Sequence, residues 1–243
     1  MQKSVLGKLW QPVTIQEDLV TKISRELQIG DFLAKLVSTR VSSAEEAFDF
    51  LDPKIKRLLP DPFHLLDMQQ GVERVVQGIK NREKICIFAD YDVDGATSAA
   101  LLKNVFRELG IEVEIYVPDR IEEGYGPTLS AMQKIKDKGN KVLITVDCGS
   151  VAFEALLHAS DIGLDVIVID HHISLDKLPK AVAVINPNRI DEGSNYKNLA
   201  AVGVSFLFAV AFCWALRQQG FFEDNSIKHP DLIKQLDIVA LGT

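Results

Sequence analysis

Three short runs of mostly apolar residues in the middle of the chain each stop at an aspartate. The runs occupy residues 85–89, 142–146 and 166–169, and they are followed by Asp90, Asp147 and Asp170. Strands that are buried on both faces have this composition, because their positions do not alternate between core and solvent. The chain is therefore expected to contain a parallel sheet that helices cover on both faces.

Helical patterns separate these strands along the sequence. Strands are expected at residues 84–90, 112–117, 141–147, 165–170 and 181–185. Helices are expected at residues 68–80, 96–109, 127–138 and 150–160. This alternation predicts an α/β fold with a mainly parallel sheet. Because ligands bind beyond the carboxyl ends of the strands in such sheets, the aspartates that follow the strands are expected to share one functional edge.

The beginning of the chain has a different pattern. Ser42 or Ser43 is expected to cap a short helix, in a stretch whose other segments also look like short helices. Pro60 then interrupts the helical pattern and marks a boundary. The sequence therefore predicts a short helical N-terminal extension, residues 1–60, followed by a catalytic domain, residues 61–243.

Composition restricts the classes of function. The net charge of −7 gives no overall basic surface, so a polyanionic substrate would have to be held by a local patch or by metal ions. Cys86, Cys148 and Cys213 are far apart, which is typical of thiols in a reducing compartment and predicts a cytoplasmic protein. Residues 199–216 carry no charge and are long enough for a membrane span. No cluster of basic residues accompanies them, so a buried core helix and no membrane association are expected.

The first acidic motif follows the first of the three apolar runs. Asp90, Asp92 and Asp94 lie at alternate positions before Gly95. In an extended segment these carboxylates would share a face, and their mutual repulsion predicts a bound divalent cation. One alternative is that Asp94 only caps the following helix, which accounts for one acid but not for three. A calcium-binding EF-hand loop is excluded, because its twelfth position needs a glutamate and Leu101 stands there.

Two further motifs carry metal-binding side chains. Asp147 could cap the helix expected near residue 150, but beside a second acidic strand end it is also a candidate bridging carboxylate. His171 and His172 follow Asp170 directly, so one imidazole can bind a metal while the other meets substrate or a second ion. Mixed carboxylate and imidazole ligands suit Mn²⁺ or Mg²⁺ better than structural zinc. Two such ions would activate a water and stabilise the leaving oxygen in phosphoester hydrolysis.

Four weaker candidates lie outside these motifs. Asp237 is a single acid in an apolar segment, where a buried aspartate needs a partner and a metal ion is one option. Arg120 and Tyr125 lie in a polar, glycine-rich loop and could hold a phosphate and stack on a base. Arg189, in a similar turn, is a candidate anion ligand. Spacing alone favours a plain surface loop for Arg120 and Tyr125.

The order of the motifs resembles that of a known family. The motifs are D-Y-D-V-D-G at residues 90–95, V-D-C-G at 146–149, D-H-H at 170–172, G-V-S-F at 203–206 and D-I-V-A-L-G-T at 237–243. They are similar to those of the DHH phosphoesterases, and most closely to those of the bacterial RecJ exonucleases. The resemblance covers about residues 40–243. It implies a 5′-to-3′ exonuclease that hydrolyses single-stranded DNA with two Mn²⁺ or Mg²⁺ ions in repair and recombination, with a helicase and a single-strand-binding protein as partners.

The resemblance also implies roles for individual residues. The implied metal ligands are Asp90, Asp92, Asp94, Asp147, His171 and Asp237. The implied catalytic set is Asp92, Asp94, Asp147, His171 and His172, with His172 facing the scissile phosphate. Phe88 stands where many DHH proteins have a histidine, and Asp90 is expected to compensate. RecJ-like proteins continue beyond the position of Thr243, so the chain is expected to be an N-terminal catalytic fragment.

Two other functions compete with this hypothesis. One is a DHH phosphoesterase for small substrates, which would act on short oligonucleotides, cyclic dinucleotides or pyrophosphate. The other is a catalytically silent replication scaffold with a degenerate DHH fold, which should lack the metal ligands.

Overall fold

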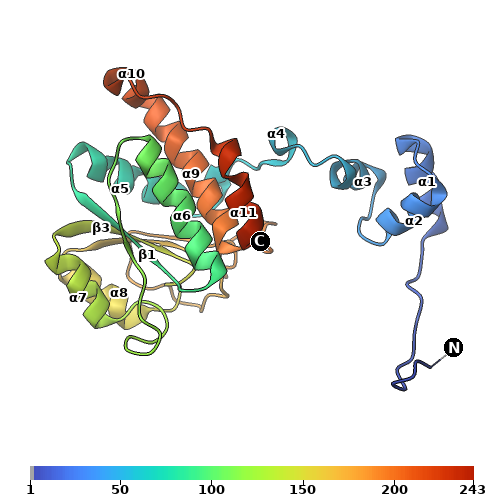
Figure 1. The fold of residues 1–243 in the computed structure, drawn as a ribbon, viewed down its shortest axis with the longest axis horizontal. Helices are drawn as coiled ribbons and strands as arrows, with labels where there is room; N and C mark the ends of the chain where they lie inside the picture. The colour runs from blue at the N-terminus through green and yellow to red at the C-terminus, as the bar shows by residue number, and fades with distance from the viewer. Residues whose placement is uncertain (1–2) are drawn as a thin grey trace. The chain divides into compact units, whose positions relative to one another are not determined.

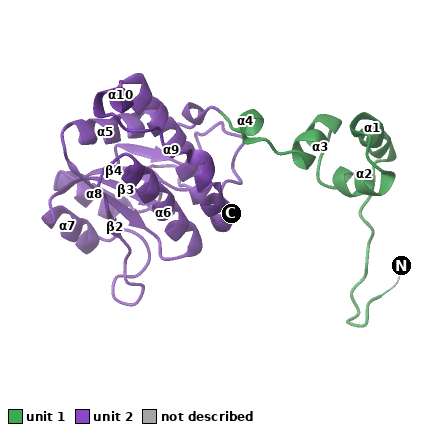
Figure 2. Cartoon of the chain, turned by 45° about the horizontal axis from the view of Figure 1, so that its top comes forward, with its two compact units in different colours: residues 1–60 green, residues 61–243 purple. Residues whose placement is uncertain are grey.

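The computed structural model describes residues 3–243, which form two compact units. One unit ends at Pro60, and the other comprises Asp61–Thr243 (Figure 2). Pro60 and Pro62 flank the division between them. Proline lacks a backbone N–H group and fixes its own φ angle, so regular structure tends to end at such a position.

The N-terminal unit consists of short helices. They are α1 (Glu17–Leu27), α2 (Asp31–Ser38), α3 (Ala44–Leu51) and α4 (Ile55–Leu58). Ser43 caps α3, because its hydroxyl accepts a hydrogen bond from the Glu46 N–H group at 3.1 Å. The Glu46 carboxylate in turn accepts from the Ser42 N–H group at 2.7 Å, which completes a reciprocal cap. The helix start expected at Ser42 or Ser43 is confirmed.

A parallel sheet forms the centre of the second unit (Figure 1). Its strands are β1 (Lys84–Ala89), β2 (Glu114–Tyr116), β3 (Asn140–Val146), β4 (Asp165–Ile169) and β5 (Ala183–Ile185). All neighbours pair in parallel in the order β2-β1-β3-β4-β5. Each strand overlaps one of the expected strands, so the predicted α/β fold is confirmed.

Helices cover both faces of this sheet. Val166 and Val168 of β4 belong to a buried cluster that also holds residues of α7 (Leu129–Asp137) and α8 (Phe153–Asp161). Between them, the side chain of Ile167 lies against Gly71 of α5 (Met68–Lys80). Because successive side chains of a strand point to opposite faces, α7 and α8 cover one face and α5 covers the other.

The remaining helices pack on or near α5. They are α6 (Val93–Glu108), α9 (Ala201–Gln218), α10 (Phe221–Asn225) and α11 (Leu236–Gly242), with 3₁₀ turns at Pro62–His64 and Leu232–Gln235. Helix α9 packs against both α5 and α6, and α11 packs against α6 (Figure 1).

Helix α9 is the apolar segment that raised the alternative of a membrane span. It is long and apolar enough to cross a membrane, yet 72% of its 18 residues are buried inside the protein. Phe208 is 0% exposed and stacks on Phe212 with the ring centroids 6.2 Å apart. A continuously apolar helix is expected wherever protein surrounds it on most sides. The expectation of a core helix is confirmed.

Truncating the centre of α9 should test this assignment. The substitution Phe208→Ala is expected to lower the free energy of unfolding by about 3–5 kcal/mol, because it leaves a cavity in a packed core. Urea unfolding followed by circular dichroism would measure the loss. Leu157→Ala on α8 is the control, since Leu157 is 52% exposed and should cost much less. Equal losses in the two variants would argue against α9 as a core helix.

The strand order has a switch point at the carboxyl edge. The chain leaves β1 toward β2 on one side and leaves β3 toward β4 on the other, so the direction of winding reverses between β1 and β3. At such a switch point the flanking loops diverge and leave room for a ligand. The segments that follow β1 and β3 begin with Asp90 and Asp147.

Candidate functional site

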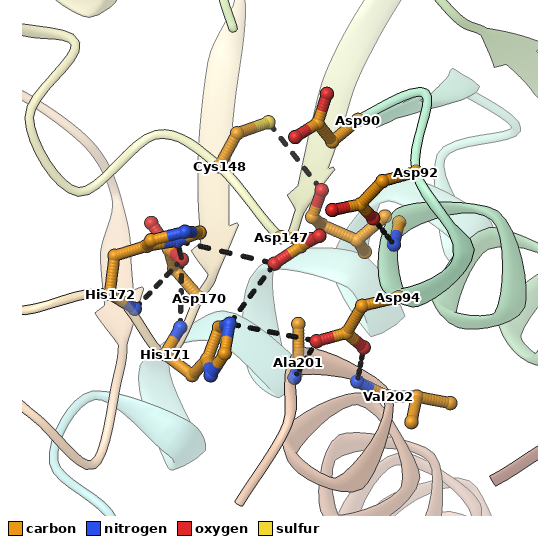
Figure 3. A network of polar contacts seen from close by, with 12 residues as sticks. Asp90, Asp92, Asp94, Asp147, Cys148, Asp170, His171, His172, Ala201 and Val202 are labelled. Atoms are coloured by element: carbon orange, nitrogen blue, oxygen red, sulfur yellow. Dashed lines mark hydrogen bonds and ion pairs between the residues drawn. The ribbon is translucent and has the colours of Figure 1, made fainter. Parts of the chain in front are cut away.

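The acidic and imidazole side chains converge beyond the carboxyl ends of β1, β3 and β4. Figure 3 shows the side chains of Asp92, Asp94 and Asp147 pointing toward the pair His171 and His172. They follow three strand ends that are far apart in the sequence. The prediction that these strand ends share one edge of the sheet is confirmed. No single motif could have shown this convergence.

The segment after β1 differs from the expected extended run. The strand ends at Ala89 and α6 already begins at Val93, so the three aspartates do not alternate along a strand. The helix cap is Asp92, whose Oδ1 accepts from the Gly95 N–H group at 3.0 Å, and the alternative that assigned this cap to Asp94 is wrong. Gly95 makes the tight connection feasible, because a Cβ atom there would lie 2.5 Å from the Asp90 carbonyl oxygen.

Asp94 instead joins α6 to α9. Its Oδ2 accepts from the Ala201 N–H group and its Oδ1 from the Val202 N–H group, both at 2.7 Å (Figure 3). Helix α9 has no side-chain cap of its own, because residue 200 is an alanine. Asp94 therefore satisfies two free N–H groups at the positive end of α9. Its Oδ2 also lies 3.6 Å from Nε2 of His171.

Asp147 lies at the centre of the cluster. Its φ angle of +61° is rare for a residue with a Cβ atom, although aspartate tolerates this region better than most. The residue is 2% exposed, and its Oδ1 lies 3.3 Å from Nε2 of His171. That alignment is too poor for a hydrogen bond, so Oδ1 is buried without a hydrogen-bond partner within residues 3–243. Such an orphaned carboxylate oxygen fits a metal ligand.

The backbone beyond Asp147 is also shaped around the site. Gly149 has a φ angle of +117°, and a Cβ atom there would lie 2.8 Å from the Thr145 hydroxyl. A residue with a side chain would therefore be strained at this position in both backbone angle and packing. Positive φ angles two residues apart let β3 turn directly into the site.

Asp170 orients the histidine pair. Its Oδ1 accepts from Nδ1 of His172 at 2.8 Å and from the His171 N–H group at 2.7 Å, and its Oδ2 accepts from the Ser150 N–H group at 3.0 Å. The contact to Nδ1 directs Nε2 of His172 away from Asp170. The sequence reasoning gave no separate role to Asp170, although its place between a buried strand and two histidines was a usable signal.

The electrostatics of the metal-free site are those of crowded, desolvated acids. Burial raises the pKa of Asp147 to about 6, and the charges of Asp94 and Asp92 add to this rise. Burial also raises the pKa of Asp90. For Asp92 burial acts in the same direction and is the largest single influence, but the hydrogen bond from Gly95, further hydrogen bonds and the charge of His172 together outweigh it, so the pKa is lowered. Removing a carboxylate from water disfavours its charged form unless a cation or a donor compensates.

The two imidazoles are the local source of positive charge. A hydrogen bond to Asp170 raises the pKa of His172 to about 9, and contact with Asp147 raises the pKa of His171. In both cases a neighbouring carboxylate raises the pKa of the imidazole, and this effect exceeds the lowering caused by burial of the ring. The metal-free cluster therefore favours protonated imidazoles. An imidazole that binds a divalent ion must release its proton.

Two groups of ligand atoms in the cluster could each surround one ion. Asp90, Asp92 and Asp147 form one group, and Asp147, His171 and His172 form the other. Within each group the ligand atoms lie within 4.8 Å of one another. Asp147 belongs to both groups, as expected for a bridging carboxylate.

Among the candidate metal ligands from the sequence, Asp94 and Asp237 belong to neither group. Asp237 is exposed on α11, and its carboxylate accepts from the Ile238 N–H group at 2.7 Å. Arg189 is 6% exposed, and its guanidinium group pairs with Asp67 and Asp191 at 2.7 Å each. Arg189 is thus a buried anchor with paired charges and not a free anion ligand, contrary to the expectation for this turn.

The loop candidates lie beside the cluster. The Arg120 guanidinium lies 5.2 Å from the ring centroid of Tyr91, and Tyr125 meets Tyr91 edge to face at 6.4 Å. Burial raises the pKa of Tyr125, and the nearby charge of Asp90 adds to this rise. The sequence reasoning missed Tyr91, although its position inside the acidic motif was a usable signal.

Cys148 is a core thiol. It is 2% exposed, and burial raises its pKa well above the ordinary value. Its Sγ lies 3.4 Å from the Val146 carbonyl oxygen. A thiol that is held neutral is a poor nucleophile, which agrees with the structural role expected for Cys148.

Comparison with known proteins gives a consistent relationship. Residues 84–243 match the model of the DHH family, N-terminal domain. The single-stranded-DNA-specific exonuclease RecJ of Bacillus subtilis is 35% identical over 96% of this chain, and that of Escherichia coli is 37% identical over 89%. The chain spans 28% and 37% of the length of these two relatives.

Solved structures agree with the fold. A crystal structure of exonuclease RecJ bound to manganese has a TM-score of 0.61 and 26% identity, over 74% of this chain and 43% of that one. RecJ from Thermus thermophilus in complex with Mn²⁺ has a TM-score of 0.68 at 22% identity, over 94% of this chain and 30% of that one. Together with the match over residues 84–243, these likenesses show that the chain belongs to the DHH family.

Proposed function

We propose that this chain carries the catalytic centre of a RecJ-like exonuclease that hydrolyses single-stranded DNA from the 5′ end with two Mn²⁺ or Mg²⁺ ions. The observation that carries the proposal is the position of Asp147, whose buried carboxylate belongs to two groups of ligand atoms. The RecJ relatives from Bacillus subtilis and Escherichia coli are named as single-stranded-DNA-specific exonucleases, which supports the choice of substrate. The proposed setting is DNA repair and recombination in the cytoplasm.

The residues present fit two hard divalent ions. Asp90, Asp92 and Asp147 would hold one ion, and carboxylate oxygens are the ligands that Mg²⁺ and Mn²⁺ prefer. Asp147 and His171 would hold the other, with Asp94 close enough to His171 to join them. When bound, a pair of ions supplies an activated water and stabilises charge on the leaving oxygen. Asp147 would belong to both ligand sets, and its Oδ1 is buried without a hydrogen-bond partner in the described part of the chain.

His172 would act on the scissile phosphate. Its Nδ1 is held by Asp170 at 2.8 Å, so Nε2 is the nitrogen that can face a substrate. The Asp170 carboxylate that accepts from Nδ1 also favours positive charge on this ring. In its protonated form the ring would donate a hydrogen bond from Nε2 to a phosphate oxygen and add positive charge there.

The loop beside the cluster would hold the end of the strand. Arg120 is a donor for a phosphate, and Tyr91 and Tyr125 offer aromatic faces for a base. Arg120→Ala and Tyr125→Ala are each expected to raise KM for single-stranded DNA about tenfold, because a lost stacking contact costs about 1–3 kcal/mol. Steady-state kinetics on labelled oligonucleotides would measure this rise. Ile121→Ala, in the same loop and 95% exposed, is the control that should change neither constant.

The proposed reaction has a direct test. The protein should release mononucleotides from 5′-labelled single strands when Mn²⁺ is present and should stop when EDTA removes the ion. Strands labelled at the 3′ end should lose their label last. Activity that survives both Asp147→Ala and His171→Ala would contradict the proposal. Faster turnover of dinucleotides than of long strands would instead favour the small-substrate alternative.

The proposed partners follow from the substrate. A nuclease that acts on single strands needs a helicase to expose them and a single-strand-binding protein to keep them open. Blunt duplex DNA is therefore expected to resist the enzyme until a helicase and its nucleotide are added. A gel assay of duplex degradation measures this dependence, and equal degradation without helicase would remove the need for such partners.

A further inference from the structure

The loop between β5 and α9 contacts the backbone of both histidines of the cluster. It contains Asn186 and Asn188 on either side of a proline. The side-chain amides of both asparagines are bonded to backbone carbonyl groups of the histidines. Their amide groups thus point at groups that set the position of the imidazoles.

Asn186 is 0% exposed, and both polar atoms of its side-chain amide form hydrogen bonds. Its Nδ2 donates to the His172 carbonyl oxygen and to the Ser150 hydroxyl, both at 2.8 Å. Its Oδ1 accepts from the Asn188 N–H group at 2.7 Å. Ser150 in turn donates its N–H group to Asp170, the residue that holds Nδ1 of His172. Asn186 thus reaches His172 directly through the backbone and indirectly through Ser150 and Asp170.

Asn188 makes the matching contact to the other histidine. Its Nδ2 donates to the His171 carbonyl oxygen at 2.6 Å and to the Lys197 carbonyl oxygen at 3.0 Å. The second bond attaches it to the chain just before α9. The position of the His171 backbone therefore depends on the loop as well as on β4.

The loop itself is fixed by a buried ion pair. The Arg189 guanidinium donates to the Val184 carbonyl oxygen at 2.8 Å and to Asp67 at 2.7 Å, and the Asp67 carboxylate also accepts from the Val184 N–H group at 3.0 Å. A buried guanidinium with all these partners holds a single geometry. The two asparagines are therefore presented to the histidines by a rigid support.

We infer that Asn186 and Asn188 are positioning residues that fix the carbonyl groups of His172 and His171 and so aim both imidazoles into the cluster. The expected effect on metal binding rests on the proposed function. An imidazole that is free to rotate binds an ion more weakly than one that is held in place. Residues that orient metal ligands without touching the metal typically contribute 10–100-fold to affinity or activity. Their role is distinct from that of Asp170, which orients a ring nitrogen and not a backbone carbonyl.

The test uses Asn186→Ala and Asn188→Ala with a matched control. Asn140 is 2% exposed, and its Nδ2 also donates twice, to Glu114 at 3.2 Å and to the Ile135 carbonyl oxygen at 3.1 Å. It lies at the start of β3, at the opposite end of the sheet from the cluster. Asn140→Ala therefore removes an equally buried amide without touching the histidines. Asn188 is only partly buried, so its variant remains informative if Asn186→Ala fails to fold.

Two measurements separate positioning from stability. Calorimetric titration with Mn²⁺ is expected to show affinity about tenfold weaker in Asn186→Ala and Asn188→Ala, and unchanged in Asn140→Ala. On single-stranded DNA, kcat should fall in the first two variants while KM stays the same. Parent-like affinity and kcat in both folded variants would overturn the inference. Equal losses in Asn140→Ala would also overturn it, because the effect would then be one of general stability.

A third measurement does not depend on the proposed function. The chain has five histidines, and their imidazole signals can be followed by NMR in ¹⁵N-labelled, metal-free protein. The signals of His171 and His172 are expected to shift and broaden in Asn186→Ala and Asn188→Ala, while those of His158 and His229 stay in place. If the parent binds no Mn²⁺ but these signals change as expected, the proposed function fails and the positioning role stands. Unchanged signals in both variants would overturn the positioning role alone.

Discussion

Replacing Asp147 with asparagine is expected to abolish Mn²⁺-dependent cleavage and, at the same time, to stabilise the metal-free chain. Loss of a charged group from such a site typically costs about 10²–10³-fold in rate, and the loss should be larger here because one carboxylate serves both groups of ligands. In the absence of metal, however, Asp147 is a 2% exposed carboxylate beside Asp92 and Asp94. Asparagine removes that repulsion and keeps the shape of the side chain.

The stability difference should depend on pH. Burial raises the pKa of Asp147 in the folded, metal-free chain to about 6, from its ordinary value of 3.8. The folded state therefore binds more protons than the unfolded state between these values, and the contribution of Asp147 to stability falls as the pH rises. Asp147→Asn should match the parent near pH 4 and exceed its free energy of unfolding by up to about 3 kcal/mol above pH 6. Denaturant unfolding in EDTA at both pH values would measure this gap.

The control for this experiment is Asp176→Asn. Asp176 is exposed in the loop beyond the histidine pair, so its variant changes the net charge equally without relieving a buried carboxylate. It should leave activity and unfolding unchanged. Mn²⁺ should stabilise the parent and Asp176→Asn, because an ion that binds only the folded state raises its stability, but it should not stabilise Asp147→Asn. A metal-free Asp147→Asn protein that is less stable than the parent would contradict the picture of an acid cluster that the two imidazoles compensate only in part.

The strands of this protein were predictable because both faces of the sheet are covered. Continuous apolar runs marked β1, β3 and β4 nearly to the residue, and the helices between them then required a parallel sheet. Parallel topology in turn predicts that Asp90, Asp147 and the histidine pair lie at one edge. The convergence of the site was therefore a consequence of topology.

The contacts that hold the site together were not predictable in the same way. Asp94 bonds N–H groups more than one hundred residues away, at Ala201 and Val202, and nothing in the local sequence marks that pairing. The start of α6 was placed too late because Asp92, and not a residue nearer Gly95, provides the cap. For Arg189 the partner Asp67 likewise lies far away in sequence, although its other partner, Asp191, lies two residues on and was a usable local signal. Local patterns encode which elements form, whereas pairings across the fold depend on packing.

The second large effect is expected for Asp94. Replacing it should lower the metal-free stability, whereas replacing Asp147 should raise it. Asp94→Ala should lower the free energy of unfolding of the metal-free chain by about 1–2 kcal/mol, the usual cost of losing a helix N-cap. It removes both acceptors from the first turn of α9, whose own residue 200 offers none. Unfolding in EDTA measures this loss without any contribution from metal binding.

A graded series makes the prediction specific. Asp94→Asn keeps one acceptor oxygen for the N–H groups of Ala201 and Val202, so its metal-free stability should fall between those of Asp94→Ala and the parent. Both variants should also lose Mn²⁺-dependent activity, since Asp94 lies 3.6 Å from His171 in the proposed centre. If Asp94→Ala were as stable as the parent in EDTA, the capping role would fail even though activity was lost. Opposite effects of Asp94 and Asp147 on metal-free stability would mean that Asp94 stabilises the fold itself, whereas the burial of Asp147 is only partly compensated until a metal ion binds.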